Sequence, residues 1–420
     1  MLTLTLSRGK GIGGSLKQSA DSFVVKEIAK NGIAMSPGVR YSAADLGEVE
    51  SNDGKFVKFV LQKKNWDSIH ALQEIAKRIH RGVRSVGYAG MKDKIATTVQ
   101  LASVFGAKAA EVSRVNIKDI SINGAWQSST GVEMGDLEGN AFEVTIEGVD
   151  ANSDAIDGVY AELSGIAPNY FDRQRFGIRL NNHIVGMHIV KGEFEAAALE
   201  FLTGTSNETN EAALEARRRL AEEGDFKKAL DYFPAYLRYE RAMLAHLSIN
   251  PGDFANAIRR LPRGISLLFV HALESYIFNR ALEKRIESMD INAEGGLSCN
   301  ADAQGFPDIS STGVGHEGKF AVGNIVGYDT KEAYMSSYEK EALEEIGISK
   351  DEFKIKSMPE LSMKGAFRVF FSPFKDFSYS ISENAVKMKF SLPAGSYATV
   401  LANEFMKNSC LSLDPATARS

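Results

Sequence analysis

Apolar and polar residues alternate in several short segments of the first 150 residues, as they do in half-buried β-strands. The pattern occurs at residues 2–6, 23–28, 56–62 and 141–147. Asp67 or Ser68 can then cap a helix, because short polar side chains accept hydrogen bonds from the first free backbone N–H groups. The apolar stripe predicted for this helix comprises Ile69, Leu72, Ile75, Ala76 and Ile79. The first part of the chain is therefore predicted to mix strands and helices.

The pattern changes further along the chain. A helix is predicted from Ser153, with Ile156, Val159, Tyr160 and Leu163 on one face. Helical periodicity then dominates residues 183–287, fades in the glycine-rich residues 295–329, and returns at residues 331–345. Alternation resumes at residues 367–371 and 386–390. We expect an α+β body interrupted by a mainly helical insertion, with the last strands returning to the body.

This organisation gives three predicted segments. Residues 1–191 and 366–420 form the two parts of a catalytic domain, and residues 192–365 form the inserted domain. The length of 420 residues fits two domains. A hydrophobic fraction of 44% and a charged fraction of 25% exclude a disordered or collagen-like chain. The net charge of −5 means that binding a polyanion requires local basic patches.

Cysteine content and hydropathy indicate the cellular compartment. Cys299 and Cys410 are far apart, so a disulfide framework is excluded and a reducing cytoplasm fits best. The apolar stretch at residues 1–10 is too short for a signal peptide. No apolar run approaches the ~18–20 residues that a membrane span requires. We expect a cytoplasmic protein with no membrane association.

The familiar cofactor motifs are weak or missing. Gly9–Gly14 satisfies G-x-G-x-x-G, but residues 15–20 are too few to form the helix that a dinucleotide-binding motif must open. His183 and His188 are five residues apart with no carboxylate between them, unlike a zinc-binding H-E-x-x-H motif. A P-loop is absent as well. No metal and no organic cofactor are therefore predicted.

The segment GMKDKIATTVQ, residues 90–100, is the most informative motif. It places Asp93 between Lys92 and Lys94, directly after a predicted strand. Neighbouring cations favour the charged form of a carboxylate, which keeps it available as a nucleophile. A surface turn and a catalytic aspartate both fit this pattern.

A second motif, NYFDRQRFG, covers residues 169–177 and interleaves aromatic side chains with amides and cations. Rings can stack on an unpaired base, amides can read its edge, and guanidinium groups can hold phosphate. A loop that plugs the core with Phe171 and Phe176 fits equally well.

Together these motifs resemble the tRNA pseudouridine synthase D (TruD) family. The resemblance extends to residues 21–27 (DSFVVKE), residues 390–399 (FSLPAGSYAT) and, more loosely, the helix at residues 272–279 (ALESYIFN). It spans about residues 13–407, and the body motifs occur in the order of the family. The resemblance implies a pseudouridine synthase catalytic fold, with a mixed, mostly antiparallel sheet, helices and a large α/β insertion.

The resemblance also implies site residues. The nucleophilic aspartate of the family falls on Asp93, and its uracil-pocket residues fall on Phe23, Asn169, Phe171 and Tyr397. Many relatives carry Phe at the last position, and either ring can stack. The basic residue of the active site falls on Lys17, with Lys92 as a second candidate.

The implied reaction is isomerisation of a uridine to pseudouridine in tRNA, at position 13, without a cofactor. The aspartate attacks either C1′ of the ribose or C6 of the base, and the sequence leaves both open. The target must be flipped out of its stack. A monomer is favoured. A catalytically silent RNA-binding protein on the same fold is the alternative, and a nucleotide-dependent oxidoreductase would depend on Gly9–Gly14 alone.

Basic clusters are candidates for phosphate contacts. They occur at residues 55–64, 77–84, 217–219 and 259–260. In the first two, solvated faces of a strand and a helix explain the charges equally well. We expect the arginines of the insertion to face an RNA-binding cleft. The alternative is that Arg259 and Arg260 end a helix that begins near Asp253, where cations interact favourably with the helix dipole.

Overall fold

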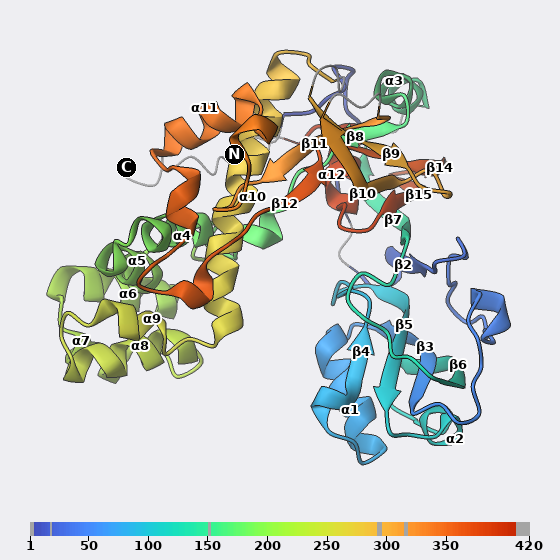
Figure 1. The fold of residues 1–420 in the computed structure, drawn as a ribbon, viewed down its shortest axis with the longest axis horizontal. Helices are drawn as coiled ribbons and strands as arrows, with labels where there is room; N and C mark the ends of the chain where they lie inside the picture. The colour runs from blue at the N-terminus through green and yellow to red at the C-terminus, as the bar shows by residue number, and fades with distance from the viewer. Residues whose placement is uncertain (1–3, 17–18, 150–152, 292–295, 315–317, 409–420) are drawn as a thin grey trace.

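The computed structural model describes residues 4–16, 19–149, 153–291, 296–314 and 318–408. Two lobes extend to the same side of an upper region (Figure 1). The first, helical lobe contains the helices between residues 182 and 258. The second lobe contains the strands and helices between residues 56 and 128. The last strands of the chain lie in the upper region, beside strands from the first 150 residues.

Within the described residues, a nine-stranded sheet runs through the upper region and the second lobe in the order β14-β15-β7-β2-β5-β3-β6, with β1 paired to β7 and β4 to β5. Among the described strands of this sheet, only β2 and β5 pair in parallel, so the sheet is mixed and mostly antiparallel, as predicted. Its strands are β1 Gly13–Leu16, β2 Phe23–Ile28, β3 Phe56–Lys64, β4 Val86–Tyr88, β5 Thr97–Phe105, β6 Ile120–Ser128, β7 Gly139–Val149, β14 Lys375–Ser382 and β15 Ala385–Pro393. Helices α1 Ser68–Arg78, α2 Ala109–Ser113, α3 Ser153–Leu163 and α12 Ala398–Met406 accompany it.

The C-terminal strand returns to the N-terminal half, as predicted from its alternating pattern. Strand β15 pairs with β7 along its whole length, from Ala385 opposite Glu147 to Pro393 opposite Gly139. The buried faces of both strands contribute to one hydrophobic cluster, which also includes residues of α3 and α12. Residues more than 200 positions apart therefore share one core.

Helix α1 shows how local sequence sets an element boundary. Asp67 is its N-cap, and the Asp67 carboxylate accepts the His70 N–H at 3.0 Å. The predicted apolar stripe is confirmed at Leu72, Ile75 and Ala76, which are buried. The prediction that Ile69 belongs to it is wrong, because Ile69 is 38% exposed. Ser68 is buried in its place, since the first turn directs the residue after the cap toward β5.

The strand predicted at residues 2–6 does not form in its described part, residues 4–6. Here the backbone N–H groups of Leu6 and Ser7 donate to the Glu404 carboxylate at 2.8 and 3.1 Å. A carboxylate on α12 satisfies the donors that a neighbouring strand would otherwise satisfy, so the segment packs as irregular chain. Residues 2 and 3 lie outside the described residues.

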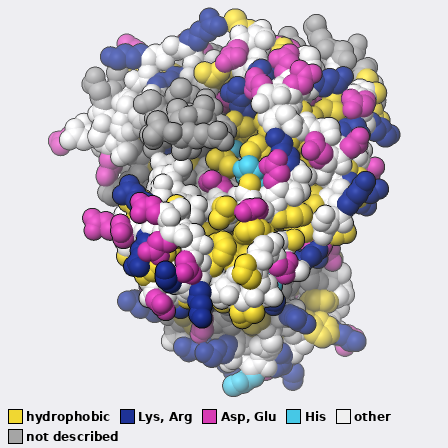
Figure 2. Space-filling view, turned by 90° about the vertical axis from the view of Figure 1, so that its left-hand side faces the viewer, with side chains coloured by type: hydrophobic (Ala, Val, Ile, Leu, Met, Phe, Trp, Pro, Cys, Tyr) yellow, Lys and Arg dark blue, Asp and Glu magenta, His cyan; other side chains and the backbone are white. Residues whose placement is uncertain are grey.

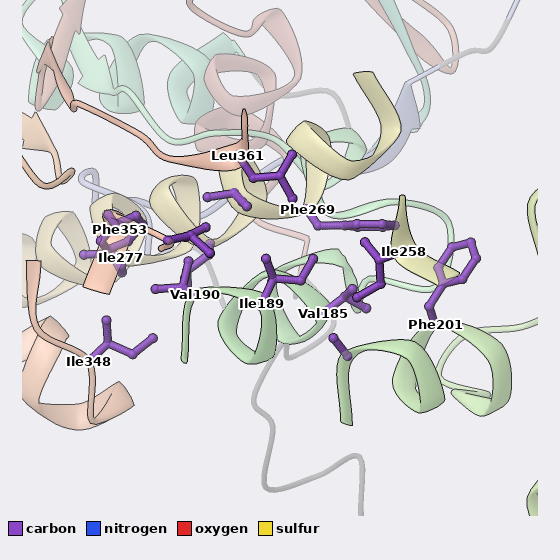
Figure 3. Close-up of a cluster of buried hydrophobic side chains, with 14 of the residues drawn as sticks. Val185, Ile189, Val190, Phe201, Ile258, Phe269, Ile277, Ile348, Phe353 and Leu361 are labelled. Atoms are coloured by element: carbon purple, nitrogen blue, oxygen red, sulfur yellow. The ribbon is translucent and has the colours of Figure 1, made fainter. Parts of the chain in front are cut away.

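The helical lobe gathers around the longest helix in the described chain. Its helices are α4 Asn182–Lys191, α5 Phe194–Thr203, α6 Glu211–Glu223, α7 Phe226–Tyr232, α8 Arg238–Ile249, α9 Phe254–Ile258, α10 Arg263–Glu287 and α11 Ser337–Ile346. Side chains from α4, α5, α9 and α10 meet in a buried apolar cluster, together with Ile348, Phe353 and Leu361 (Figure 3). Helix α10 runs from this lobe into the upper region and so links the two.

Two smaller sheets connect the helical lobe to the body. Strands β9 Leu297–Ala301, β10 Pro307–Val314, β11 Phe320–Ile325 and β12 Ala366–Val369 form a sheet in the order β10-β9-β11-β12. Strand β13 Phe371–Pro373 pairs with β8 Ile166–Pro168. The predicted segment limits at residues 192 and 365 stay predictions. Helix α4 already packs in the core of the helical lobe, and β12 pairs with β11.

Two arginines of the predicted basic clusters pair with carboxylates inside the helical lobe, while the expectation that these clusters face RNA stays a prediction. Arg217 is 2% exposed and its guanidinium pairs with Glu240 at 2.6 Å. Arg259 is the C-cap of α9 and pairs with Glu360 at 2.8 Å. Helix α9 has Asp253 as its N-cap, so the helix-ending alternative describes Arg259. Figure 2 shows basic and acidic side chains interspersed around a hydrophobic centre on one face of the molecule.

None of the described helices combines the length and apolar character that would let it cross a membrane.

The contact between α10 and the loop after β8 yields a stability prediction. Asn279 is fully buried, and its side chain accepts the Phe171 N–H and donates to the Phe171 carbonyl, both at 2.9 Å. Asn279→Leu keeps the approximate volume but leaves both backbone groups unpaired. We expect the free energy of unfolding to fall by about 2–4 kcal/mol, measured by urea denaturation.

Asn116→Leu, at an exposed loop position, is the control and should change the free energy of unfolding by less than about 0.5 kcal/mol. Equal effects of the two substitutions would contradict the importance of the Asn279 contact.

Candidate active site

Asp93 lies in the connection between β4 and β5, residues 89–96, and is half-buried. The two strands pair antiparallel, so this connection closes a hairpin at the sheet edge of the second lobe. Lys63, near the end of the neighbouring β3, is fully buried beneath it. The Lys63 ammonium donates to the backbone carbonyls of Asp93 at 2.7 Å and of Lys92 at 3.4 Å. A buried cation therefore supports the turn that carries the aspartate.

Lys92 anchors the Asp93 loop to the sheet through an ion pair with Glu27 on β2. Its ammonium lies 2.6 Å from the Glu27 carboxylate, and both side chains are buried. Its backbone N–H donates to the Ser68 hydroxyl at 3.0 Å. Glu27 in turn accepts the Leu101 N–H at 2.9 Å. Lys92 thus holds the loop between β2, β5 and α1.

Burial and charge oppose each other at Asp93. Burial raises the pKa of the Asp93 carboxyl, while the Lys63 and Lys92 charges and a hydrogen bond from the Gln174 side chain counteract that rise. Burial also lowers the pKa of Lys63 to about 8, against the opposing influence of Asp93 and Asp67. The carboxylate is therefore poorly solvated and at the same time stabilised by a cation, which suits a nucleophile.

The loop of residues 169–177 brings a second carboxylate to the site. Burial raises the pKa of Asp172, a rise that the Arg173 backbone and the Thr399 side chain counteract by hydrogen bonding and that the charge of Asp93 increases. Gln174, in the 3-10 helix Arg173–Phe176, hydrogen-bonds to Asp93. The two sequence motifs therefore meet in space, and two carboxylates lie in one electrostatic environment.

Arg368 on β12 holds this second loop. Its guanidinium donates to the Asn169 carbonyl at 3.1 Å, to Asn169 Oδ1 at 2.7 Å and to the Gly395 carbonyl at 3.1 Å. It also lies 4.1 Å from the centre of the Phe171 ring. Burial lowers the pKa of Arg368 to about 10, so it remains charged at neutral pH.

Asn169, which the resemblance places in the uracil pocket, has protein partners for its amide. Its Nδ2 donates to the Val369 carbonyl at 3.0 Å, and its Oδ1 accepts from Arg368 and from the Ser396 hydroxyl at 3.0 Å. The side chain is 4% exposed. In this conformation Asn169 positions the loop and offers little surface to a ligand.

The aromatic residues of the predicted pocket come from three segments. The Phe171 and Tyr397 rings approach edge to face with centres 6.4 Å apart, and Tyr397 is the N-cap residue of α12. Phe171 is 6% exposed, and Arg175 lies 5.3 Å from its ring centre. Phe23 begins β2, and the next residue, Val24, pairs with Thr97 just after the Asp93 loop. The Phe23 ring packs edge to face on Phe142.

Lys17, predicted as the basic residue of the site, lies outside the described residues. The sequence did not single out Lys63, Arg368 or Asp172. Lys63 sits in a basic run, KK, that resembles any solvated strand face. The one available signal was strand alternation, which places Lys63 on the same buried face as Phe59 and Leu61.

A family model described as tRNA pseudouridine synthase D (TruD) matches residues 2–405. The "Probable tRNA pseudouridine synthase D" of Methanosarcina acetivorans is 32% identical over 438 residues, covering 97% of this chain and 95% of that protein. The protein of the same name from Methanopyrus kandleri is 37% identical over 360 residues, covering 84% and 86%.

The crystal structure of the TruD protein from Methanosarcina mazei has the same fold, with a TM-score of 0.77, 31% sequence identity and 97% coverage of both chains. The mixed α+β architecture, the family motifs and a match that spans almost the whole chain agree. This chain belongs to the tRNA pseudouridine synthase D family of enzymes.

Proposed function

We propose that this tRNA pseudouridine synthase isomerises uridine 13 of tRNA and that Asp93 supplies the nucleophile. The observation that supports the nucleophile most directly is the position of Asp93, which is half-buried on a loop held by Lys63 and lies next to Gln174 from the second motif. The choice of uridine 13 follows from the family resemblance.

The reaction exchanges one bond to the ribose for another. The N1–C1′ bond breaks with covalent assistance from the Asp93 carboxylate at C1′ or at C6, the uracil rotates, and a C5–C1′ bond forms. The proton on C5 then leaves, and N1 gains one. Since atoms and electrons balance without an oxidant, the chain needs to supply only a nucleophile, a pocket and a proton carrier.

Asp172 is the group that we assign to the proton transfer. It is the second carboxylate of the site, and both burial and the charge of Asp93 raise its pKa. A carboxylate with a raised pKa is a stronger base than an ordinary aspartate and is better suited to accept the C5 proton. We assign the nucleophilic role to Asp93, whose charge Lys63 stabilises, and the proton transfer to Asp172.

The aromatic side chains hold the detached base. A flipped uridine loses its stacking in the RNA, which costs a few kcal/mol. Tyr397 and Phe23, which are partly exposed, offer ring surfaces that replace part of it, and Phe171 packs edge to face against Tyr397. Arg368 keeps the loop of Asn169 and Phe171 fixed from behind, so the pocket is organised before the RNA binds.

Asp93→Asn tests the nucleophile. The amide keeps the volume but is a far weaker nucleophile, so we expect pseudouridine formation in tRNA to fall by at least about a thousandfold. The dissociation constant for tRNA should change little. Asp53→Asn, at an exposed turn, is the control and should leave turnover unchanged. More than a few per cent residual turnover in the Asp93 variant would refute the assignment.

The pKa of Lys63 predicts a pH profile. Turnover should rise with pH as Asp93 ionises and fall through pH 8 as Lys63, whose pKa is about 8, loses its proton. A neutral amine no longer stabilises the Asp93 charge. Lys63→Arg keeps its charge at all these pH values and should move the falling limb upward by at least about one pH unit. The measurement is single-turnover rate from pH 5 to 9.5.

Lys64→Arg is the matched control. Lys64 is the next residue along β3 after Lys63, but its ammonium pairs with Asp21 and not with the Asp93 loop. The substitution should leave the falling limb in place. If Lys63→Arg also leaves it in place, another group titrates there.

Arg368→Lys tests the support of the second loop. An ammonium cannot replace the three hydrogen bonds and the ring contact of the guanidinium. We expect single-turnover rate to fall about a hundredfold, because misplaced reacting groups are costly even when they are present. Arg219→Lys, on the exposed face of α6, should have no effect. Wild-type turnover in Arg368→Lys would show that the loop keeps its position without the guanidinium.

A further inference from the structure

A cavity of about 270 Å³ opens beside the Asp93 loop and is not part of the site described above. The connection between β3 and α1 forms one wall, with Asn65 and Trp66. Gln73 and Glu74 of α1 form a second wall, and Lys94 closes the cavity on the side of the loop. Asp67 and His70 at the start of α1 complete the lining. The cavity therefore combines an indole ring and an imidazole with two amides, two carboxylates and one lysine.

The cavity begins one residue away from the proposed nucleophile. Lys94 follows Asp93, and consecutive Cα atoms are only about 3.8 Å apart. The opposite wall begins at Asn65, two residues after Lys63, which supports the Asp93 turn. An RNA strand that presents a flipped uridine to Asp93 has its neighbouring nucleotides within reach of this cavity.

Trp66 is held in a fixed position. Its indole N–H donates to the Lys118 carbonyl at 3.1 Å, and its ring packs against the core between α1 and the sheet. Asn65 before it has a positive φ of 58°, and Asp67 after it caps α1. The turn and the cap fix the backbone on both sides of Trp66. A ring that is already immobilised loses little conformational entropy when a base stacks on it.

The polar groups around Trp66 suit the edge of a base. Amides of Asn65 and Gln73 can both donate and accept hydrogen bonds, and the Glu74 carboxylate accepts them. Lys94 is exposed and can contact a phosphate. Stacking on an aromatic ring with hydrogen bonds to the base edge is how proteins recognise unpaired nucleotides.

We propose that this cavity binds an unpaired nucleobase that neighbours the target uridine, stacked on Trp66 with its phosphate on Lys94. The proposal rests on the proposed function, because it takes RNA as the substrate. It assigns α1 and the connection before it a role in selecting the RNA, in addition to their role in holding the Asp93 loop.

Fluorescence can observe this site directly. The chain has two tryptophans, and the other, Trp126, is 2% exposed in the core. In Asp93→Asn protein, which binds RNA without turnover, substrate tRNA should quench the emission saturably. Adding Trp66→Phe should abolish the quenching, whereas adding Trp126→Phe should preserve it. Quenching by tRNA that survives Trp66→Phe would overturn the proposal.

A short unpaired RNA and the same RNA with abasic positions separate base from phosphate. The normal RNA should quench Trp66, and the abasic RNA of equal length should not. Equal quenching by both would show that only the backbone is bound and would refute a base pocket.

Turnover gives an independent measure. Trp66→Ala should raise KM for tRNA by roughly 5- to 150-fold, as loss of one stacked base does, with kcat within about twofold. Gln73→Phe, which fills the cavity from the surface of α1 and leaves Trp66 in place, should raise KM in the same direction even if Trp66→Ala folds poorly. Tyr239→Ala, an aromatic residue 40% exposed on α8 in the other lobe, is the matched control.

The two proposals fail differently. If wild-type protein forms pseudouridine but Gln73→Phe leaves KM unchanged and Trp66 is not quenched, the pocket is refuted and the proposed function stands. If Trp66 is quenched by unpaired RNA but tRNA is never modified, the pocket is supported and the proposed function is refuted.

Discussion

The guanidinium of Arg368 is the contact on which the geometry of the site depends. It reaches from β12 to the loop after β8 and to the segment before α12, with three hydrogen bonds and a ring contact on Phe171. Asn169 and Arg368 are 199 residues apart in the chain, and Gly395 lies a further 27 residues on. A single planar cation with several donors can fix all of them at once, which a lysine cannot do. Asn279 of α10 fixes the same loop from the other side.

On the opposite side of the site, the balance between burial and charge governs the aspartate. Burial raises the pKa of the Asp93 carboxyl, and the charges of Lys63 and Lys92 counteract this rise. Lys63 supports the loop from directly below, whereas Lys92 is engaged by Glu27 in the middle of the sheet. The carboxylate is thereby held on a rigid loop and shielded from water. The Asp93 loop and the loop of residues 169–177 come from different parts of the fold. Gln174 and Asp172 of the second loop interact with Asp93.

Two arginines of the helical lobe form ion pairs within the lobe. Arg217 and Arg259 stabilise contacts within the lobe, through Glu240 and Glu360. Isolated basic clusters in the sequence therefore overestimate the charge available for RNA. The proposed contacts next to Asp93 lie instead in the lobe of β3–β6, where Trp66 and Lys94 flank the same cavity.

Periodicity, capping and local composition were enough to predict the strands at 23–28, 56–62 and 141–147, the helix from Ser68 and the Asp93 motif. The sequence could not place Ile69, whose orientation is set by the packing of the first helical turn, or the segment at residues 4–6, whose donors are satisfied by Glu404. Three contacts emerge only in the folded chain: Lys63 lies beneath Asp93, Asn169 binds Arg368, and Asp172 lies in the same electrostatic environment as Asp93. Each of these depends on groups brought together from distant parts of the chain, and no local pattern encodes which buried charge will meet which partner.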